Sequence, residues 1–286
     1  MMNRRLFLKT VSGSVVAGLA SQVYAAPLLL KNPGVVSFSF REQLFKDFTG
    51  TLDRIKQMGI TEIEFSNLFG KTAEEVRTAL NERVMTCPSY GVEHDDLIKK
   101  TEKCVSDAQA LGAKYIRLAW LKKRQPFTLE LATQTANEFN EIGRYMREHG
   151  LTFCYHNHGY EFVKHEKGTL FDILMEKTTP EDVSFELDMV WAFIAGVDPT
   201  QLLEKYGKRI KLLHVKDLRN GVKTGDLTGK TDPKNIMAAG EGQLDVPAVI
   251  KAAVKAGVQH YFIEDESPDS DRQVPRAYQY LKGLKA

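Results

Sequence analysis

The chain has few cysteines. Only Cys87, Cys104 and Cys154 occur in 286 residues, and no two of them share the short spacing typical of a zinc site. An odd number at such separations makes a disulfide framework unexpected, which excludes the small disulfide-stabilised folds. Cys154 lies in a β-rich run and is predicted to be a small buried apolar side chain.

Excess charge and long apolar runs are also missing. The chain has 39 Lys and Arg against 37 Asp and Glu, so its formal net charge is +2. This balance gives no support for a nucleic-acid partner. No run after the first thirty residues is apolar for long enough to span a bilayer. With 43% hydrophobic residues, the chain has the composition of an ordinary globular protein with one large core.

The N-terminus has a different character from the rest. Arg4 and Arg5 precede the apolar run 11–20, and small residues at Ala25 and Ala26 follow. This pattern predicts a twin-arginine export signal over residues 1–26, with an amphipathic surface helix as the alternative. The folded domain would then cover residues 27–286, in the periplasm, with no stable membrane insertion after cleavage. Such signals export folded proteins, which is compatible with a metal site assembled in the cytoplasm.

One local pattern recurs along the chain: a helical segment ends in glycine and a β-rich run follows within a few residues. Glycine fits the left-handed position that ends a helix, so these are helix-to-strand junctions. The predicted strands cover residues 35–40, 61–65, 83–86, 114–118, 152–156, 183–187, 210–214 and 260–264. The predicted helices cover residues 49–58, 72–80, 95–110, 128–149, 168–176, 199–206, 246–256 and 271–283. Eight βα units predict a single (β/α)₈ TIM barrel. The alternative, an open doubly wound sheet, lacks its G-x-G-x-x-G turn.

The last four predicted strands each finish on a potential metal ligand: Glu161, Asp188, His214 and Glu264. In a barrel the carboxyl ends of the strands form the active site, so these groups are expected to converge. Three carboxylates and one imidazole suit Mn²⁺, Mg²⁺, Co²⁺, Fe²⁺ or Zn²⁺. Each residue also has an ordinary structural interpretation. Asp188 or Glu161 would cap a helix, His214 would be a satisfied core histidine, and Glu264 would belong to a charged rim with its acidic neighbours.

Other side chains at the strand ends are candidates for contact with a ligand. Glu64 ends the second strand, Tyr90 follows the third and Trp120 follows the fourth. Trp120 and Trp191 are either packing residues or a wall on which a sugar ring stacks. The segment 215–245 is an unusually long loop, a feature typical of functional or mobile segments.

Four segments resemble the sugar phosphate isomerase/epimerase family, a group of xylose-isomerase-like TIM barrels. They are Tyr155-His-Asn-His-Gly-Tyr-Glu-Phe162, Glu186-Leu-Asp-Met-Val-Trp191 with the following Ala195–Pro199, His214-Val-Lys-Asp217 and Gly240-Glu-Gly-Gln-Leu-Asp245. Their order along the chain matches strands five to eight of that family. The resemblance covers essentially the whole chain after the signal, and it specifies the family more sharply than the substrate.

The resemblance implies one divalent ion held by Glu161, Asp188, His214 and Glu264. Several branches of the family place the strand-five ligand directly on the strand, where this chain has His156. Glu161 is the expected ligand here, His156 is the alternative, and His156 otherwise serves as a substrate or acid/base group. His158 is the expected acid or base because imidazole titrates near neutrality. Lys216 is expected to stabilise an oxyanion.

The chemistry implied by the resemblance is removal of a proton beside a carbonyl, through an enediolate that the metal stabilises. An exported protein meets unphosphorylated sugars, so we expect a neutral keto-sugar or 3-keto-glycoside that is isomerised, epimerised or cleaved by β-elimination. The alternative is a periplasmic sugar-binding protein on a non-catalytic barrel. A homodimer is left open. The sequence does not choose the sugar, the metal or the product.

Overall fold

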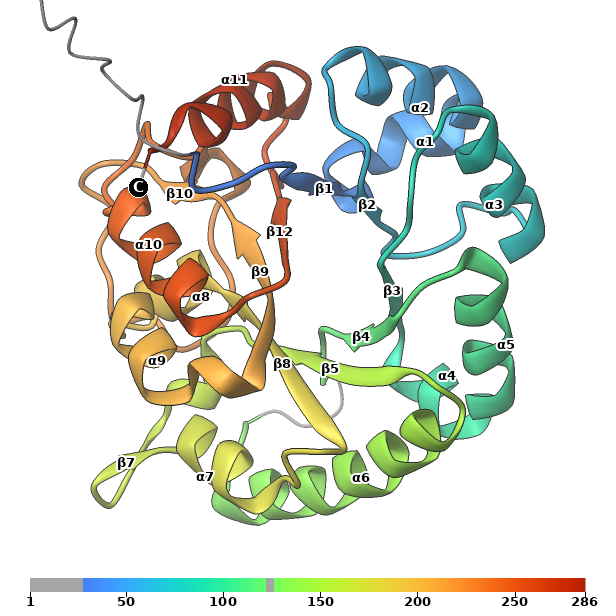
Figure 1. Ribbon diagram of the computed structural model, residues 1–286. Coiled ribbons are helices and arrows are strands. Elements are labelled where there is room, and N and C mark those ends of the chain that lie inside the picture. The colour runs from blue at the N-terminus through green and yellow to red at the C-terminus, as the bar shows by residue number, and fades with distance from the viewer. Residues whose placement is uncertain (1–27, 122–125, 286) are drawn as a thin grey trace, which may run out of the picture.

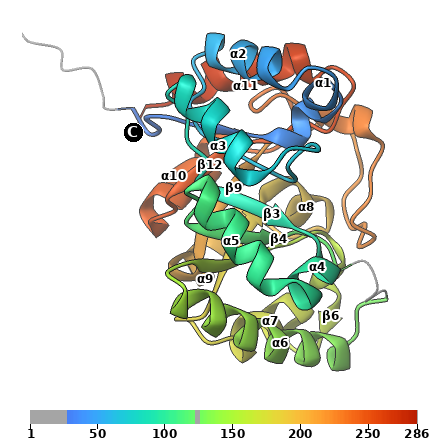
Figure 2. The ribbon, with the colours of Figure 1, turned by 90° about the vertical axis from the view of Figure 1, so that its right-hand side faces the viewer.

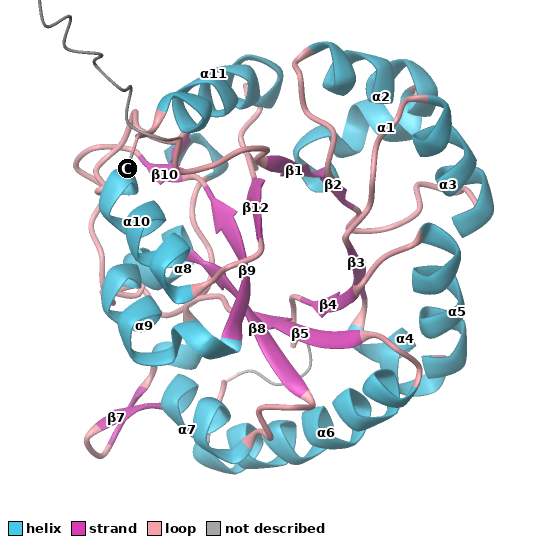
Figure 3. Ribbon diagram, viewed as in Figure 1, coloured by secondary structure: helices cyan, strands magenta, loops and turns pink. Residues whose placement is uncertain are grey.

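The computed structural model describes residues 28–121 and 126–285 of the chain. The expected export signal over residues 1–26 therefore lies outside the described residues. Figures 1 and 3 show a central ring of strands surrounded by helices. The predicted (β/α)₈ barrel is confirmed. The barrel strands are β1 Gly34–Val36, β2 Ile63–Glu64, β3 Ser89–Val92, β4 Tyr115–Leu118, β5 Thr152–His156, β8 Val183–Asp188, β9 Ile210–Val215 and β12 His260–Ile263.

All neighbouring pairs among these strands are parallel, in the order β2-β1-β12-β9-β8-β5-β4-β3. The ring closes between β2 and β3 through the single parallel bridges Glu62↔Thr86 and Phe65↔Tyr90. The register sets His156 beside Glu186 and Asp188 beside His214. Polar residues from successive strands are therefore brought to one level of the barrel.

The outer helices mostly lie where the glycine pattern predicts them. They are α2 Phe48–Gln57, α3 Ala73–Glu82, α4 His94–Lys99, α5 Thr101–Leu111, α6 Leu129–Glu148, α7 Leu170–Lys177, α9 Pro199–Tyr206, α10 Val246–Ala256 and α11 Ser270–Gly283. Gly112 and Gly257 end their helices in the left-handed conformation. Thr72 and Thr169 each start a helix with a reciprocal capping box. Local capping therefore explains most of the boundaries.

Three predicted boundaries are wrong. The stretch 83–86 is not a strand, because α3 continues to Glu82 and exposed Val84 then takes a positive φ of 52°. The first strand is predicted to reach residue 40 but ends at Val36. The chain then forms the 3₁₀ turn Ser37–Phe40 and the short helix α1 Arg41–Lys46. The helix predicted over 95–110 is divided at Lys100, where φ is −138° and ψ is 38°.

Side chains that alternate along the strands divide the barrel interior into layers. Val36, Tyr115, Cys154, Leu212 and Phe262 form a separate apolar cluster. Because side chains alternate with a period of two, the residues two positions further along four of these strands also face inward. These are Arg117, His156, His214 and Glu264. A charged layer thus follows the apolar layer towards the carboxyl ends of the strands.

The segment after β9 contains a hairpin and is not one structureless loop. β10 Asp217–Leu218 pairs antiparallel with β11 Ile236–Met237. Figure 2 shows this orange segment at the side of the barrel that also holds α4 and the short strand β6 Lys164–His165. It reaches the β5 end of the barrel, since a Cβ on Gly229 would lie 3.0 Å from that of His158. No helix in the described part of the chain is long and apolar enough to cross a membrane.

Asp217 organises this segment from a fully buried position. Its carboxylate accepts hydrogen bonds from the backbone amides of Leu218, Gly240, Gly242 and Leu244, at 2.8–3.1 Å. Asp217→Ala leaves these donors without an acceptor and is expected to lower the free energy of unfolding by about 2–4 kcal/mol in urea. The matched control is Asp232→Ala, which removes an exposed turn-capping carboxylate from the same segment. Equal effects of the two substitutions would contradict this role of Asp217.

Candidate metal and sugar site

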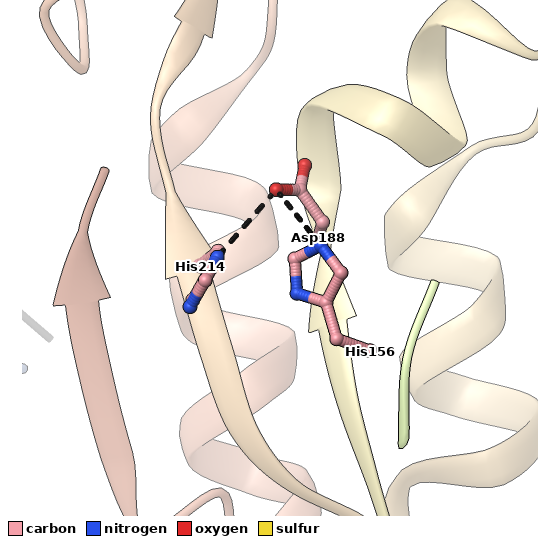
Figure 4. A group of neighbouring side chains, drawn as sticks. All are labelled: His156, Asp188 and His214. Atoms are coloured by element: carbon pink, nitrogen blue, oxygen red, sulfur yellow. Dashed lines mark ion pairs between the residues drawn. The ribbon is translucent and has the colours of Figure 1, made fainter. Parts of the chain in front are cut away.

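Asp188 lies at the centre of a buried group of potential metal ligands. Its Oδ2 lies 3.8 Å from His156 Nε2 and 3.7 Å from His214 Nδ1. Figure 4 draws these two contacts as dashed lines. The potential ligand atoms of these three residues all lie within 4.8 Å of one another. Glu264 borders the group, with Oε2 3.2 Å from His214 Nδ1. Strands β5, β8, β9 and the end of β12 each contribute one side chain.

The two carboxylate oxygens of Asp188 have different surroundings. Oδ1 accepts hydrogen bonds from the amides of Val190 and Trp191 and so caps the short helix α8 Met189–Ile194. Oδ2 is buried and forms an ion pair with Lys216 Nζ at 2.9 Å, but no hydrogen bond of good geometry reaches it from the described residues. Capping therefore leaves one oxygen of Asp188 available as a ligand.

Glu64, Arg117 and Glu186 form a second buried group, which we call the Glu64–Arg117–Glu186 triad. Arg117 donates to Glu64 Oε1 through Nη2 at 2.6 Å, and its Nε lies 3.4 Å from Glu186 Oε2. Glu186 Oε2 lies 3.2 Å from His156 Nδ1 and 3.1 Å from His214 Nε2. Glu64 Oε1 lies 2.9 Å from His214 Nε2. The triad therefore faces the ring nitrogens that point away from Asp188.

The buried ionisable groups around His156 and His214 shift one another's pKa values strongly. Burial raises the pKa of Glu64, but Arg117 and His214 more than offset it and hold the pKa at about 2. Burial and the neighbouring Glu64 raise the pKa of Glu186 well above its ordinary value. Burial, together with nearby His214, lowers the pKa of His156, so its imidazole is neutral. The lone pair of a neutral imidazole is what a metal requires.

Lys216 is buried among carboxylates. Its Nζ lies 2.6 Å from Glu264 Oε2 and 2.7 Å from Glu266 Oε1, in addition to the contact with Asp188. It also lies 5.2 Å from the ring centre of Trp191. The ammonium is therefore already occupied by ion pairs. This placement favours a role in holding the carboxylates over the oxyanion role that the sequence predicts.

A cavity of about 390 Å³ opens over these residues. Its lining combines aromatic rings with polar groups from several strand ends: Phe38, Ser66, Val92, Glu93, Arg117, Ala119, Trp120, His156, His158, Trp191, Glu264 and Glu266. Such a mixture of apolar walls and a few convergent polar groups is typical of small-molecule sites.

His158 lies in this cavity among aromatic rings. Its ring centre is 4.5 Å from that of Trp120 and 5.6 Å from that of Trp191, and it stacks parallel to Tyr160 at 5.8 Å. Its Nδ1 has no hydrogen-bond partner among the described residues. Burial lowers the pKa of His158 to about 3, which favours a neutral imidazole at this position.

Glu161 lies in the 3₁₀ turn Tyr160–Phe162 and faces neither imidazole of the Asp188 group. Its Oε1 accepts a 2.6 Å hydrogen bond from Tyr155, and both oxygens lie 3.0 Å from the amide nitrogen of His158. The side chain of Tyr155 packs against Phe139 of α6, with ring centres 4.9 Å apart. Glu161 thus holds the turn that carries His158, and the strand-five residue beside Asp188 is His156.

Burial raises the pKa of Glu161 from 4.5 to about 7. The folded protein therefore binds this proton more tightly than the unfolded chain does, and the free energy of unfolding falls as pH rises from about 4.5 to about 7. The expected loss is up to about 3 kcal/mol. Glu161→Gln should remove this slope, measured by urea unfolding across the window with the exposed Glu176→Gln as control. Parallel profiles for Glu161→Gln and the wild type would contradict the assignment.

The structure brings most of the predicted residues to one place and leaves two aside, Glu161 in its turn and Tyr90. His156, His158, Trp120, Trp191 and Glu264 line the cavity, while Asp188, His214, Glu64 and Lys216 lie buried in the network around it. Tyr90 belongs to the core instead, where burial raises its pKa. Sequence reasoning missed the roles of Arg117, Glu186 and Glu266. Glu186 was detectable, because it lies two residues before Asp188 and therefore shares its inward face.

These features define a (β/α)₈ barrel with a cluster of metal-ligand side chains at the carboxyl ends of its strands. The model of the xylose isomerase-like TIM barrel family matches residues 52–285. The chain belongs to this family, which confirms the resemblance seen in the sequence.

Two curated relatives are inosose dehydratases. Inosose dehydratase 2 of Bacillus cereus is 28% identical over 163 residues, which cover 55% of this chain and 54% of that protein. Inosose dehydratase of Geobacillus kaustophilus is 24% identical over 262 residues, covering 82% of this chain and 84% of that protein. The chain thus spans about half the length of the first relative and most of the second.

Two solved structures share the fold. A sugar phosphate isomerase/epimerase from Parabacteroides distasonis has a TM-score of 0.72 at 22% identity, with 92% of this chain and 96% of that chain covered. The IOLI protein, solved with a binding zinc atom, has a TM-score of 0.67 at 15% identity, with 89% and 96% covered. At these identities the likeness shows the fold alone.

Proposed function

We propose that this protein is a divalent-metal-dependent enzyme that removes a proton beside the carbonyl of a non-phosphorylated keto-sugar or 3-keto-glycoside. The product is an isomer, an epimer or the result of β-elimination. The observation that carries the proposal is the convergence of His156 Nε2 and His214 Nδ1 on Oδ2 of Asp188, the oxygen that does not cap α8. The inosose dehydratases among the relatives support a reaction of this class.

The residues present fit a metal ion. Asp188 Oδ2 already has one cation, Lys216 Nζ at 2.9 Å, so the fit rests on the two imidazole nitrogens and the Glu264 carboxylate that gather beside this oxygen. His156, Asp188 and His214 would hold the ion, with Glu264 as the fourth ligand and Glu161 replaced by His156 in the predicted set. Two imidazoles and two carboxylates suit Zn²⁺, Mn²⁺, Fe²⁺ or Co²⁺ better than Mg²⁺. When bound, such an ion polarises a carbonyl oxygen and favours loss of the neighbouring proton.

The chain's own residues bind and orient the sugar in this proposal. Trp120 and Trp191 offer aromatic walls to the apolar face of a sugar ring. His158 lines the cavity with an unpartnered Nδ1, and it is our candidate for the group that moves the proton. Glu266, held by Lys216 at 2.7 Å, is available to accept hydrogen bonds from substrate hydroxyls.

The cavity favours a neutral substrate over a sugar phosphate. Three carboxylates line it, from Glu93, Glu264 and Glu266. Among the described residues at the site, Arg117 is occupied by the triad and Lys216 by its ion pairs. A phosphate placed against this lining would meet carboxylates, and both of these cations already have their partners.

We also propose that the protein acts in the periplasm after twin-arginine export. The support is the sequence pattern over residues 1–26. The acidic lining of the cavity agrees with the unphosphorylated sugars expected in that compartment. Cell fractionation tests this, and replacement of Arg4 and Arg5 by lysine should retain the protein inside the cell.

Proton exchange tests the proposed reaction without knowledge of the natural substrate. Keto-sugars and 3-keto-glycosides are incubated with the metal-loaded protein in D₂O, and deuterium at the carbon next to the carbonyl is followed by NMR. We expect exchange with at least one sugar, lost after treatment with a chelator and restored by metal. A sugar that binds tightly without exchange would instead indicate a sugar-binding protein.

A further inference from the structure

Two sets of side chains near His214 could hold a cation, and they share this residue. One set is His156, Asp188 and His214, and the other is Glu64, Glu186 and His214. Arg117 decides between them. Its guanidinium contacts both carboxylates of the second set, at 2.6 Å to Glu64 and 3.4 Å to Glu186. A second cation there would be repelled by the guanidinium, so these carboxylates already have their counterion.

Burial leads to the same choice. Glu64 and Glu186 are fully buried and neither lines the cavity, whereas His156 and Glu264 do. An ion that enters through the cavity would therefore reach His156, a member of the first set, before it reached Glu64 or Glu186. The carboxylates of the second set are therefore better placed to act on the imidazoles than on an ion.

Each imidazole has one nitrogen towards Asp188 and the other towards the triad. For His156, Nε2 faces Asp188 and Nδ1 lies 3.2 Å from Glu186 Oε2. For His214 the nitrogens are reversed: Nδ1 faces Asp188, while Nε2 lies 2.9 Å from Glu64 Oε1 and 3.1 Å from Glu186 Oε2. A carboxylate that accepts the ring N–H fixes the tautomer and leaves the lone pair on the opposite nitrogen.

We infer that the Glu64–Arg117–Glu186 triad positions His156 and His214 for metal binding, and that Glu186 is the residue on which both imidazoles depend. The inference rests on the metal site proposed above and adds the residues that determine its affinity. Arg117 belongs to the triad because its guanidinium contacts both carboxylates, at 2.6 Å to Glu64 and 3.4 Å to Glu186. Glu186 is a positioning residue, since it acts through the two histidines.

The test measures metal affinity of the full chain by titration calorimetry with Zn²⁺ after chelator treatment. Glu186→Met removes the acceptor at similar volume and should weaken binding by about 10–100-fold. Glu186→Gln keeps one acceptor oxygen, so its loss should be smaller. The matched control is Glu161→Met, which empties an equally buried carboxylate position that contacts neither ligand imidazole. Its affinity should match that of the wild type.

A second readout separates positioning from a general structural defect. In the metal-free protein labelled with ¹⁵N-histidine, NMR should show Nδ1–H on His156, and Glu186→Met should change this pattern while Glu161→Met does not. If the Zn²⁺ affinity of Glu186→Met stayed within about threefold of the wild-type affinity, the inference would be overturned and the proposed function would stand. Equal loss in Glu161→Met would also overturn it. A wild-type chain without stoichiometric metal would instead overturn the proposed function.

Discussion

Asp188→Asn is expected to abolish metal binding while the barrel stays folded. The variant keeps Oδ1, which caps α8 through Val190 and Trp191, and it replaces the charged oxygen that faces the two imidazoles. Bound metal should fall from about one ion per chain to less than about a tenth, and proton exchange should fall by about a thousandfold or more. Metal analysis after desalting and the D₂O assay measure the two effects.

The control for this substitution is Asp198→Asn. Asp198 caps α9 through the amide of Thr200 and faces no imidazole, so it shares the capping role alone. Its metal content should equal that of the wild type. If Asp188→Asn retained stoichiometric metal with unchanged affinity, Asp188 would be a capping residue only.

Lys216→Met is expected to have the largest effect on stability. Lys216 is fully buried, and its removal leaves Asp188, Glu264 and Glu266 without their common cation. Loss of one partner from a buried ion cluster costs about 3–5 kcal/mol. The free energy of unfolding of the metal-free protein should fall by that amount, and exchange in the metal-loaded protein should fall more than about a hundredfold because the carboxylates lose their positions.

Urea unfolding with and without metal separates the stability contributed by the Lys216 ammonium from that contributed by a bound metal ion. Added metal should recover part of the lost stability in Lys216→Met, because it supplies another cation to Asp188 and Glu264. The control is Lys205→Met, which breaks an exposed pair with Asp172 and should cost less than about 1 kcal/mol. A Lys216→Met variant as stable as Lys205→Met would contradict the ion cluster.

The barrel was predictable because glycine-ended helices and short β-rich runs are local signals. The strand ends were predictable for the same reason, and Asp188, His214 and Glu264 do gather at one end of the barrel. The error at 83–86 arose where a β-branched residue, Val84, takes a positive φ after a helix. Local hydrogen bonds from the amides of Val84 and Met85 to the carbonyls of Asn81 and Leu80 hold that turn, and its sequence resembles a strand.

Glu161 shows where the period-two argument stops. It lies beyond the end of β5 in a 3₁₀ turn, and in such segments sequence spacing does not fix the direction of a side chain. His156 is on the strand and faces inward, as the alternation requires. For Asp188, the sequence offers helix capping and metal binding as alternatives. The two interpretations are compatible, because Oδ1 caps the helix and Oδ2 faces the imidazoles.

The most direct test of the central claim is an anomalous difference map from crystals of the protein grown with Zn²⁺ or Mn²⁺. We predict one strong peak at the carboxyl ends of the strands, with His156 Nε2, Asp188 Oδ2 and His214 Nδ1 at about 2.0–2.3 Å and the Glu264 carboxylate as the remaining protein ligand. A peak held by Glu64 and Glu186, or no peak in the barrel, would contradict the account.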